Sequence, residues 1–190
     1  VLALYEPMLN VIRQGYDPSP SAPRFHQQMA YAVCSTVYAT FQHALGRQPS
    51  WGFAGGTRSN GNGTRLVVRP YASSDRNAYY DPEAGELCFG YYQADAAVAG
   101  RNLPRGYVFT CLSHDVVAHE TSHAMLHGLR AQMLRPTNPD VLAFHEAFAD
   151  LVALFQRFTY ADVVRAAIRH SRGDLSRATL LTALGTQVGE

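Results

Sequence analysis

Two histidines that enclose a glutamate most constrain how this chain can fold, because one helix must present them together. His119 and His123 lie four residues apart, and Glu120 directly follows the first. The surrounding segment, DVVAHETSHAMLHGL, has apolar residues at a helical period. Four residues of helix turn through about 400°, so both imidazoles leave one face and can share a tetrahedral zinc ion. Glu120, rotated by about 100°, reaches a water on the ion's open position. The spacing predicts His119 and His123 as ligands and Glu120 as general base.

A second predicted helix supplies the missing carboxylate. The segment LAFHEAFAD places Glu146 and Asp150 one turn apart on the same face. One carboxylate can complete a triad of zinc ligands, while the other accepts a hydrogen bond from the free nitrogen of a ligand histidine. The alternative is a helix whose histidines are satisfied core residues without metal, and metal analysis of the purified protein distinguishes the two.

The chain of 190 residues fits one domain. Residues 15–24 are rich in proline and glycine, so we expect residues 1–24 to form an N-terminal arm and linker, followed by a domain over residues 25–190. Apolar residues at every fourth position from Met29 to Leu45 predict a long helix over residues 25–46, with Gly46 as its C-cap.

Short strands are expected next, since β-branched and aromatic residues dominate residues 64–72, 86–93 and 107–111. A helical period then predicts helices over about residues 114–130, 138–158, 160–171 and 174–187. The expected fold class is α+β: a small sheet of antiparallel type packs on the long N-terminal helix and on the helix of His119, and a helical C-terminal part follows.

These motifs resemble the thermolysin-like zinc peptidases, or gluzincins, in which an ExxxD helix follows HExxH after about two dozen residues. The segment DVVAHETSH is also similar to the family's lead-in to its active-site helix. The resemblance implies a zincin-like fold, Glu146 as the third zinc ligand and Asp150 as the hydrogen-bond partner of His119. It also implies a supporting role for Asp115, which would be a calcium ligand in the family. Because Arg157 stands where an acidic partner would be expected, bound calcium is doubtful.

The run Asn77-Ala78-Tyr79-Tyr80 is similar to the family's edge strand, whose backbone binds the peptide substrate. Asn77 and Ala78 are therefore the candidate substrate contacts, although the same run also fits an ordinary strand and turn. His145 and His114, which flank key positions, are interpreted as neighbours that contribute supporting contacts.

One departure weakens the resemblance. The family stabilises its tetrahedral oxyanion with a tyrosine and a histidine, and residues 124–145 contain no tyrosine. Losing one such donor costs about 100- to 1,000-fold in rate. His170 could substitute, but near a helix end it fits better as a partner of the helix dipole. A HExxHxxGxxH site is excluded, because positions 126 and 129 are both leucine.

Composition excludes several other functions. All 16 cationic side chains are arginine and lie scattered along the chain with a net charge of +1, which argues against nucleic acid as a partner and against lysine chemistry. No run of apolar residues is long enough to cross a membrane, and no signal peptide is visible. The odd count of cysteines, Cys34, Cys88 and Cys111, favours buried thiols and slightly favours a cytoplasmic location, although one disulfide with a spare thiol stays open.

The sequence thus predicts a zinc-dependent metallopeptidase that hydrolyses peptide or protein substrates. The rival hypothesis is a zinc-binding regulatory or interaction domain with weak or no peptidase activity. Glu120 favours the enzyme, because a purely structural zinc site has no need of a carboxylate between two ligands. Neither cleavage specificity nor oligomeric state follows from the sequence.

Overall fold

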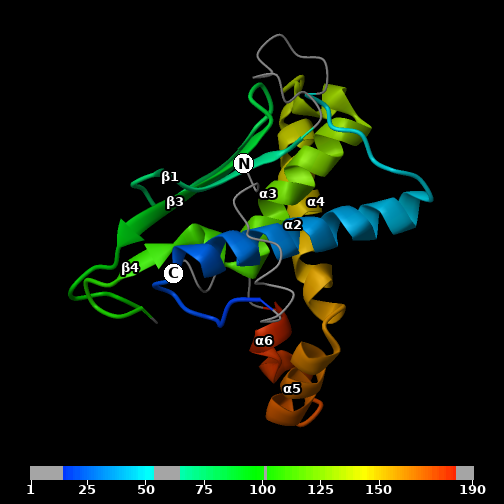
Figure 1. Ribbon diagram of the computed structural model, residues 1–190. Helices are drawn as coiled ribbons and strands as arrows, with labels where there is room; N and C mark the ends of the chain where they lie inside the picture. Colours follow the sequence, from blue (N-terminus) through cyan, green and yellow to red (C-terminus); the bar gives the residue numbers. More distant parts are fainter. Residues whose placement is uncertain (1–14, 54–64, 101, 183–190) are drawn as a thin grey trace.

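Helices and a small sheet form the α+β fold that the sequence predicts (Figure 1). The computed structural model describes residues 15–53, 65–100 and 102–182. The elements in chain order are α2 (Pro23–Leu45), β1 (Val67–Ser73), β2 (Ala78–Asp81), β3 (Glu86–Gln93), β4 (Tyr107–Phe109), η1 (Thr110–Leu112), α3 (His114–Leu129), η2 (Ala131–Leu134), α4 (Pro139–Phe158), α5 (Ala161–Ser171), η3 (Leu175–Arg177) and α6 (Thr179–Thr182).

Helix α2 confirms the predicted long N-terminal helix. It begins at Pro23, two residues earlier than expected, because proline's fixed φ suits the first helical turn. It ends at Gly46, which adopts the left-handed conformation with φ 65°. Its buried face carries Ala30, Val33 and Val37, spaced three and four residues apart, and packs against α3.

The sheet is mixed, so the expectation of an antiparallel sheet is wrong for one of its pairs. The strand order is β1-β3-β2, and β4 pairs with the second half of β3. Strands β2 and β4 run antiparallel to β3, whereas β1 runs parallel to it. A parallel neighbour is possible because the chain between β1 and β3 first forms β2, which turns back through residues 82–85 into β3. Strand β2 therefore lies at the end of the strand order.

Helix α3 lies at the centre of the molecule, between α2, strand β2 and α4 (Figure 1). Most of its residues are buried, so it lacks the single polar face of a surface helix. Its buried polar residues must then be satisfied internally. Thr121 and Ser122 are satisfied in this way, since each hydroxyl donates to the backbone carbonyl four residues earlier.

Helix α4 brings its carboxylates to α3. The side chain of Asn138 accepts a hydrogen bond from the backbone N–H of Val141 at 3.1 Å and caps the first turn. The buried face includes Ala149 and Ala153, whose small side chains allow the two helix axes to approach closely. This close approach lets side chains of α4 contact His119 and His123.

The C-terminal part is helical but less regular than expected. Helix α5 confirms the predicted helix over residues 160–171. The single helix expected over residues 174–187 is wrong for its described part, where η3 and α6 stand instead. The carboxylate of Asp174 accepts from both the backbone N–H and the hydroxyl of Ser176, which favours a tight turn there. Residues 183–190 lie outside the described part of the chain, as do residues 1–14 of the expected arm.

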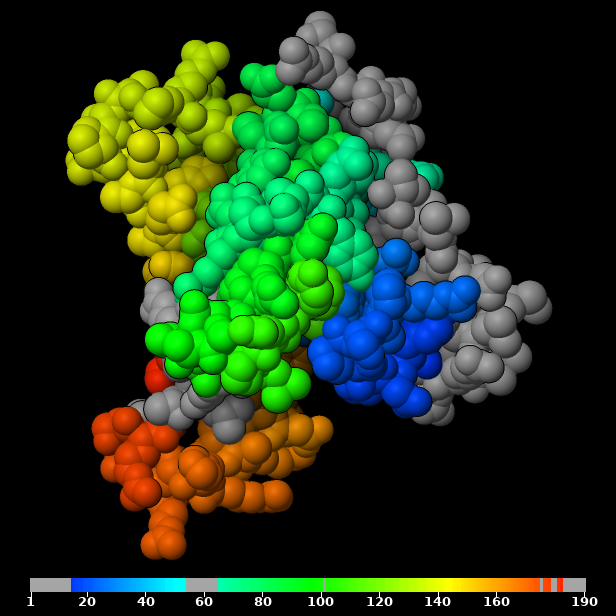
Figure 2. All heavy atoms as spheres, turned by 90° about the vertical axis from the view of Figure 1, so that its left-hand side faces the viewer, coloured from blue at the N-terminus to red at the C-terminus, as the bar shows by residue number. Residues whose placement is uncertain are grey.

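Figure 2 shows the molecule from the sheet side, with the orange and red C-terminal helices projecting below the green strands and the yellow-green residues around η2 lying beside them. None of the described helices combines the length and the apolar character that a bilayer-spanning segment needs.

Candidate metal centre

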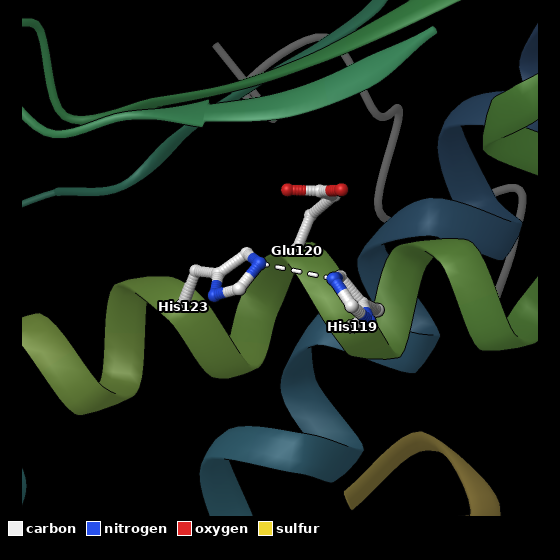
Figure 3. A group of neighbouring side chains, drawn as sticks. All are labelled: His119, Glu120 and His123. Carbon is white, nitrogen blue, oxygen red and sulfur yellow. Dashed lines mark hydrogen bonds between the residues drawn. The ribbon is translucent and has the colours of Figure 1, made fainter. Parts of the chain in front are cut away.

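The two motif histidines project from one face of α3 with their rings turned towards each other (Figure 3). The Nε2 atoms of His119 and His123 lie 3.0 Å apart, and the ring planes are almost perpendicular, at 89°. The sequence predicted this shared face from the spacing of four residues. Glu120 leaves the helix in a different direction, towards the strands, as the rotation by one residue requires (Figure 3).

Glu146 of α4 joins the two imidazoles. Its Oε2 atom lies 3.2 Å from Nε2 of His119, and its Oε1 atom lies 3.6 Å from Nε2 of His123. Glu120 also offers a carboxylate oxygen within 4.8 Å of both rings. The donor atoms of His119, Glu120 and His123, all from α3, lie close enough together to hold a metal ion, and Glu146 of α4 contacts both imidazoles.

Each ring points its second nitrogen away from the cluster centre, where another side chain contacts it. Nδ1 of His119 lies 2.9 Å from Oδ1 of Asp150, which is the contact that the family resemblance implies. Nδ1 of His123 lies 2.6 Å from Nδ1 of His145. Both Nε2 atoms are therefore directed at the centre of the cluster by residues of α4.

Burial keeps the second histidine neutral. Burial, together with the charges of His119 and His145, lowers the pKa of His123 to about 3. Burial also lowers the pKa of His145. A neutral imidazole has a free lone pair at neutral pH, which is the form that binds a metal ion.

The carboxyl of Glu120 has a strongly raised pKa. Burial raises the pKa of its carboxyl to about 7, and the nearby charge of Glu146 adds to the rise. His119 and a hydrogen bond with the backbone of Tyr80 act in the opposite direction. A carboxyl with a pKa near neutrality can both accept and return a proton at physiological pH.

The cluster opens into a hollow of about 300 Å³ between β2, α3, η2 and the start of α4. Its walls combine the cluster residues with apolar side chains, and the lining comprises Ala78, Tyr79, Tyr80, His119, Glu120, His123, Met133, Leu134, Leu142, His145 and Glu146. A hollow of this kind can receive an extended chain or a small molecule.

The two predicted substrate contacts are placed differently. Ala78 lines the hollow. Asn77 is exposed just before β2 and is not among the residues that line it; its carbonyl accepts from the backbone N–H of Gly90 at 2.8 Å. Both stay predictions. Asp115 lies at the start of α3, where its carboxylate contacts Arg157 at 2.9 Å and accepts from the hydroxyl of Ser113 at 3.0 Å.

Sequence reasoning missed the direct partner of His123 and the apolar wall. His145 was interpreted only as a supporting neighbour, and the signal was its position next to Glu146, which the helical geometry turns towards α3. His114, interpreted in the same way, instead contacts the hydroxyl of Tyr160 at 3.2 Å. Met133 and Leu134 gave no signal, because η2 has no periodic pattern. The three cysteines are buried and free, as expected.

Comparison with models of known families, with curated proteins and with solved structures gave no match for this chain. The geometry of the cluster is therefore the basis on which a function can be proposed.

Proposed function

We propose that this chain is a zinc-dependent peptidase in which His119, His123 and Glu146 bind the ion and Glu120 is the general base. The observation that supports it most is the spacing of the donor groups: the two Nε2 atoms lie 3.0 Å apart, and the two oxygens of Glu146 lie 3.2 Å from Nε2 of His119 and 3.6 Å from Nε2 of His123, respectively. Ligands bound to one zinc at about 2.0–2.2 Å in a tetrahedron lie roughly 3.3–3.6 Å apart. The observed separations of 3.0–3.6 Å are near that spacing, and a zinc ion held by these three residues would keep a fourth position for water or substrate.

The donor types support zinc over harder ions. Magnesium and calcium prefer sites built mainly from oxygen ligands, whereas two imidazoles and one carboxylate suit zinc with one open position. A zinc ion bound there would supply a Lewis acid that polarises a carbonyl group and makes a nearby water acidic. The resemblance to thermolysin-like peptidases and their zincin-like fold agrees with this donor set.

Proton transfer falls to Glu120. Its carboxylate, beside the cluster and in contact with the backbone of Tyr80, accepts a proton from the attacking water. The water oxygen bonds to the carbonyl carbon, the carbon–nitrogen bond of the peptide breaks, and the same carboxyl returns the proton to the leaving nitrogen. Strand β2, at the end of the strand order and lining the hollow with Ala78, can align the substrate backbone by edge pairing.

One observation favours the rival, a zinc-binding domain without turnover. Apart from the cluster, the polar side chains lining the hollow are Tyr79, Tyr80 and His145, and each bonds elsewhere: to Cys88, His127 and His123, respectively. Within residues 15–53, 65–100 and 102–182, both tyrosine hydroxyls that line the hollow are therefore engaged, and Nε2 of His145, which has no partner, is buried. Stabilisation of the oxyanion is the largest single contribution to catalysis in many hydrolases.

A peptide library tests the proposal. We expect cleavage by the zinc-loaded protein, loss of cleavage on removal of zinc by a chelator, and recovery when zinc is returned. Glu120→Gln should keep the zinc and lose at least about 100-fold in kcat. Stoichiometric zinc with no cleavage of any library peptide would favour the rival, and cleavage that survives the chelator would contradict both.

A further inference from the structure

The two histidines of the cluster have chemically different partners on α4. His119 faces a carboxylate, that of Asp150, whereas His123 faces another imidazole, that of His145. The distance from Nδ1 of His123 to Nδ1 of His145 is 2.6 Å, and the two rings stack with centroids 4.6 Å apart. At such a distance one nitrogen must carry the proton and the other must accept it.

The proton's location follows from which nitrogen faces the cluster. Nε2 of His123 points at His119 and Glu146, so a bound ion would take its lone pair there and leave the proton on Nδ1. Nδ1 of His145 must then be the acceptor. In a neutral imidazole the remaining proton of His145 lies on Nε2.

The surroundings of His145 agree with a fixed, neutral ring. The residue is only 5% exposed. Its Nε2 atom is buried and has no hydrogen-bond partner within the described residues. A buried imidazole with one unsatisfied nitrogen is costly for folding alone, which argues for a role that outweighs this cost.

We propose that His145 is a positioning residue that accepts the Nδ1 proton of His123 and thereby fixes the metal-binding tautomer of that ligand. The inference rests on the proposed function. It makes α4 responsible for the whole outer side of the cluster: Glu146 faces the centre, Asp150 orients His119 and His145 orients His123. It also makes the two imidazoles unequal, because a neutral acceptor polarises its donor less than a carboxylate does.

Two substitutions separate an acceptor role from a packing role. His145→Asn places a carbonyl oxygen close to the position of Nδ1, whereas His145→Leu keeps apolar bulk and removes the acceptor. We expect zinc affinity, measured by competition with a chelator, to fall about 10- to 100-fold in His145→Leu and to stay within about 3-fold of the wild type in His145→Asn. His43→Leu, at an exposed histidine near the end of α2, is the control and should leave the affinity unchanged.

The ring protons give a second readout that does not depend on the variants. In ¹⁵N spectra of the zinc-loaded wild type, Nδ1 of His123 should carry a proton and Nδ1 of His145 should not. If His145→Leu fails to fold, these spectra and His145→Asn decide the matter.

The outcomes distinguish this inference from the function on which it rests. A wild-type chain that takes up no zinc overturns both. Tight zinc binding with equal affinity in His145→Leu, or equal losses in the leucine and asparagine variants, overturns the role of His145 alone. Protonated Nδ1 on His145 overturns it as well.

Discussion

Arg157 near the end of α4 forms an ion pair with Asp115 at the start of α3, with Nη2 and Oδ2 2.9 Å apart. Asp115 lies four residues before His119, and the ion pair joins the two helices that carry the cluster. The Asp115 side chain is 3% exposed and that of Arg157 is 11% exposed. Such burial makes the guanidinium the positive charge that compensates this carboxylate.

Arg157→Leu should destabilise the fold strongly, because it leaves the Asp115 carboxylate buried without its cation. Breaking a buried pair from one side costs about 3–5 kcal/mol. Chemical denaturation of the metal-free chain measures this loss. The control is Arg165→Leu, which breaks an exposed pair with Asp162 at 2.8 Å and should cost less than about 1 kcal/mol. Equal losses in the free energy of unfolding for the two variants would show that burial does not make the ion pair of Asp115 more important for stability than an exposed pair.

Calcium should not stabilise the wild type. The guanidinium of Arg157 already neutralises the carboxylate of Asp115, so this carboxylate does not need a divalent ion. Millimolar calcium should therefore leave the thermal midpoint of the zinc-loaded chain unchanged. A calcium-dependent rise in that midpoint would contradict the role assigned to Arg157.

Glu120→Gln should stabilise the metal-free chain at high pH only. The Glu120 pKa is about 7 in the fold against an ordinary 4.5, so the folded chain binds this proton more tightly than the unfolded one. The protonated carboxyl thus costs the fold of the wild type nothing below pH 4.5, and the free energy of unfolding of the wild type falls as the pH rises through 7. Glutamine never ionises, so the variant should gain about 3 kcal/mol on the wild type between pH 4.5 and 8. A pH-independent difference would show that the carboxyl is not perturbed.

Asp150→Ala should weaken zinc binding by removing the acceptor that orients His119. Losing such an outer partner costs about 10- to 100-fold in affinity. Competition with a chelator measures the loss, and Asp162→Ala on α5 provides a carboxylate control away from the cluster. An unchanged zinc affinity in Asp150→Ala would show that Asp150 does not orient His119 for metal binding, despite the 2.9 Å contact between the two side chains.

The local signals predicted helices α2, α3, α4 and α5. The four-residue ladder of α2, the proline and asparagine at the start of α4, and the period of α3 are short-range patterns that one stretch of chain carries in itself. The parallel pairing of β1 with β3 is a long-range choice, and the strand patterns were the same for either direction. That is why the prediction of antiparallel pairing was wrong for β1 and β3.

The same division applies to the site. His119, Glu120 and His123 share a helix, so spacing alone predicted their relative directions. The contacts of Glu146 and Asp150 required α4 to cross α3 at the right level, and the family resemblance supplied that expectation. His145 had neither aid, because the contact of a ring one residue before Glu146 depends on how the buried alanines of α4 set the distance between the helices.

X-ray absorption at the zinc edge of the loaded chain would observe the proposed ligands of the ion directly. We expect one zinc per chain with two imidazole nitrogens and a carboxylate oxygen at about 2.0–2.2 Å, and a fourth, exchangeable light-atom ligand. Loss of one imidazole from the spectrum in His123→Ala would tie the signal to this cluster. A closed shell of four protein ligands, a thiolate sulfur at about 2.3 Å, or no bound zinc would contradict the proposed zinc site.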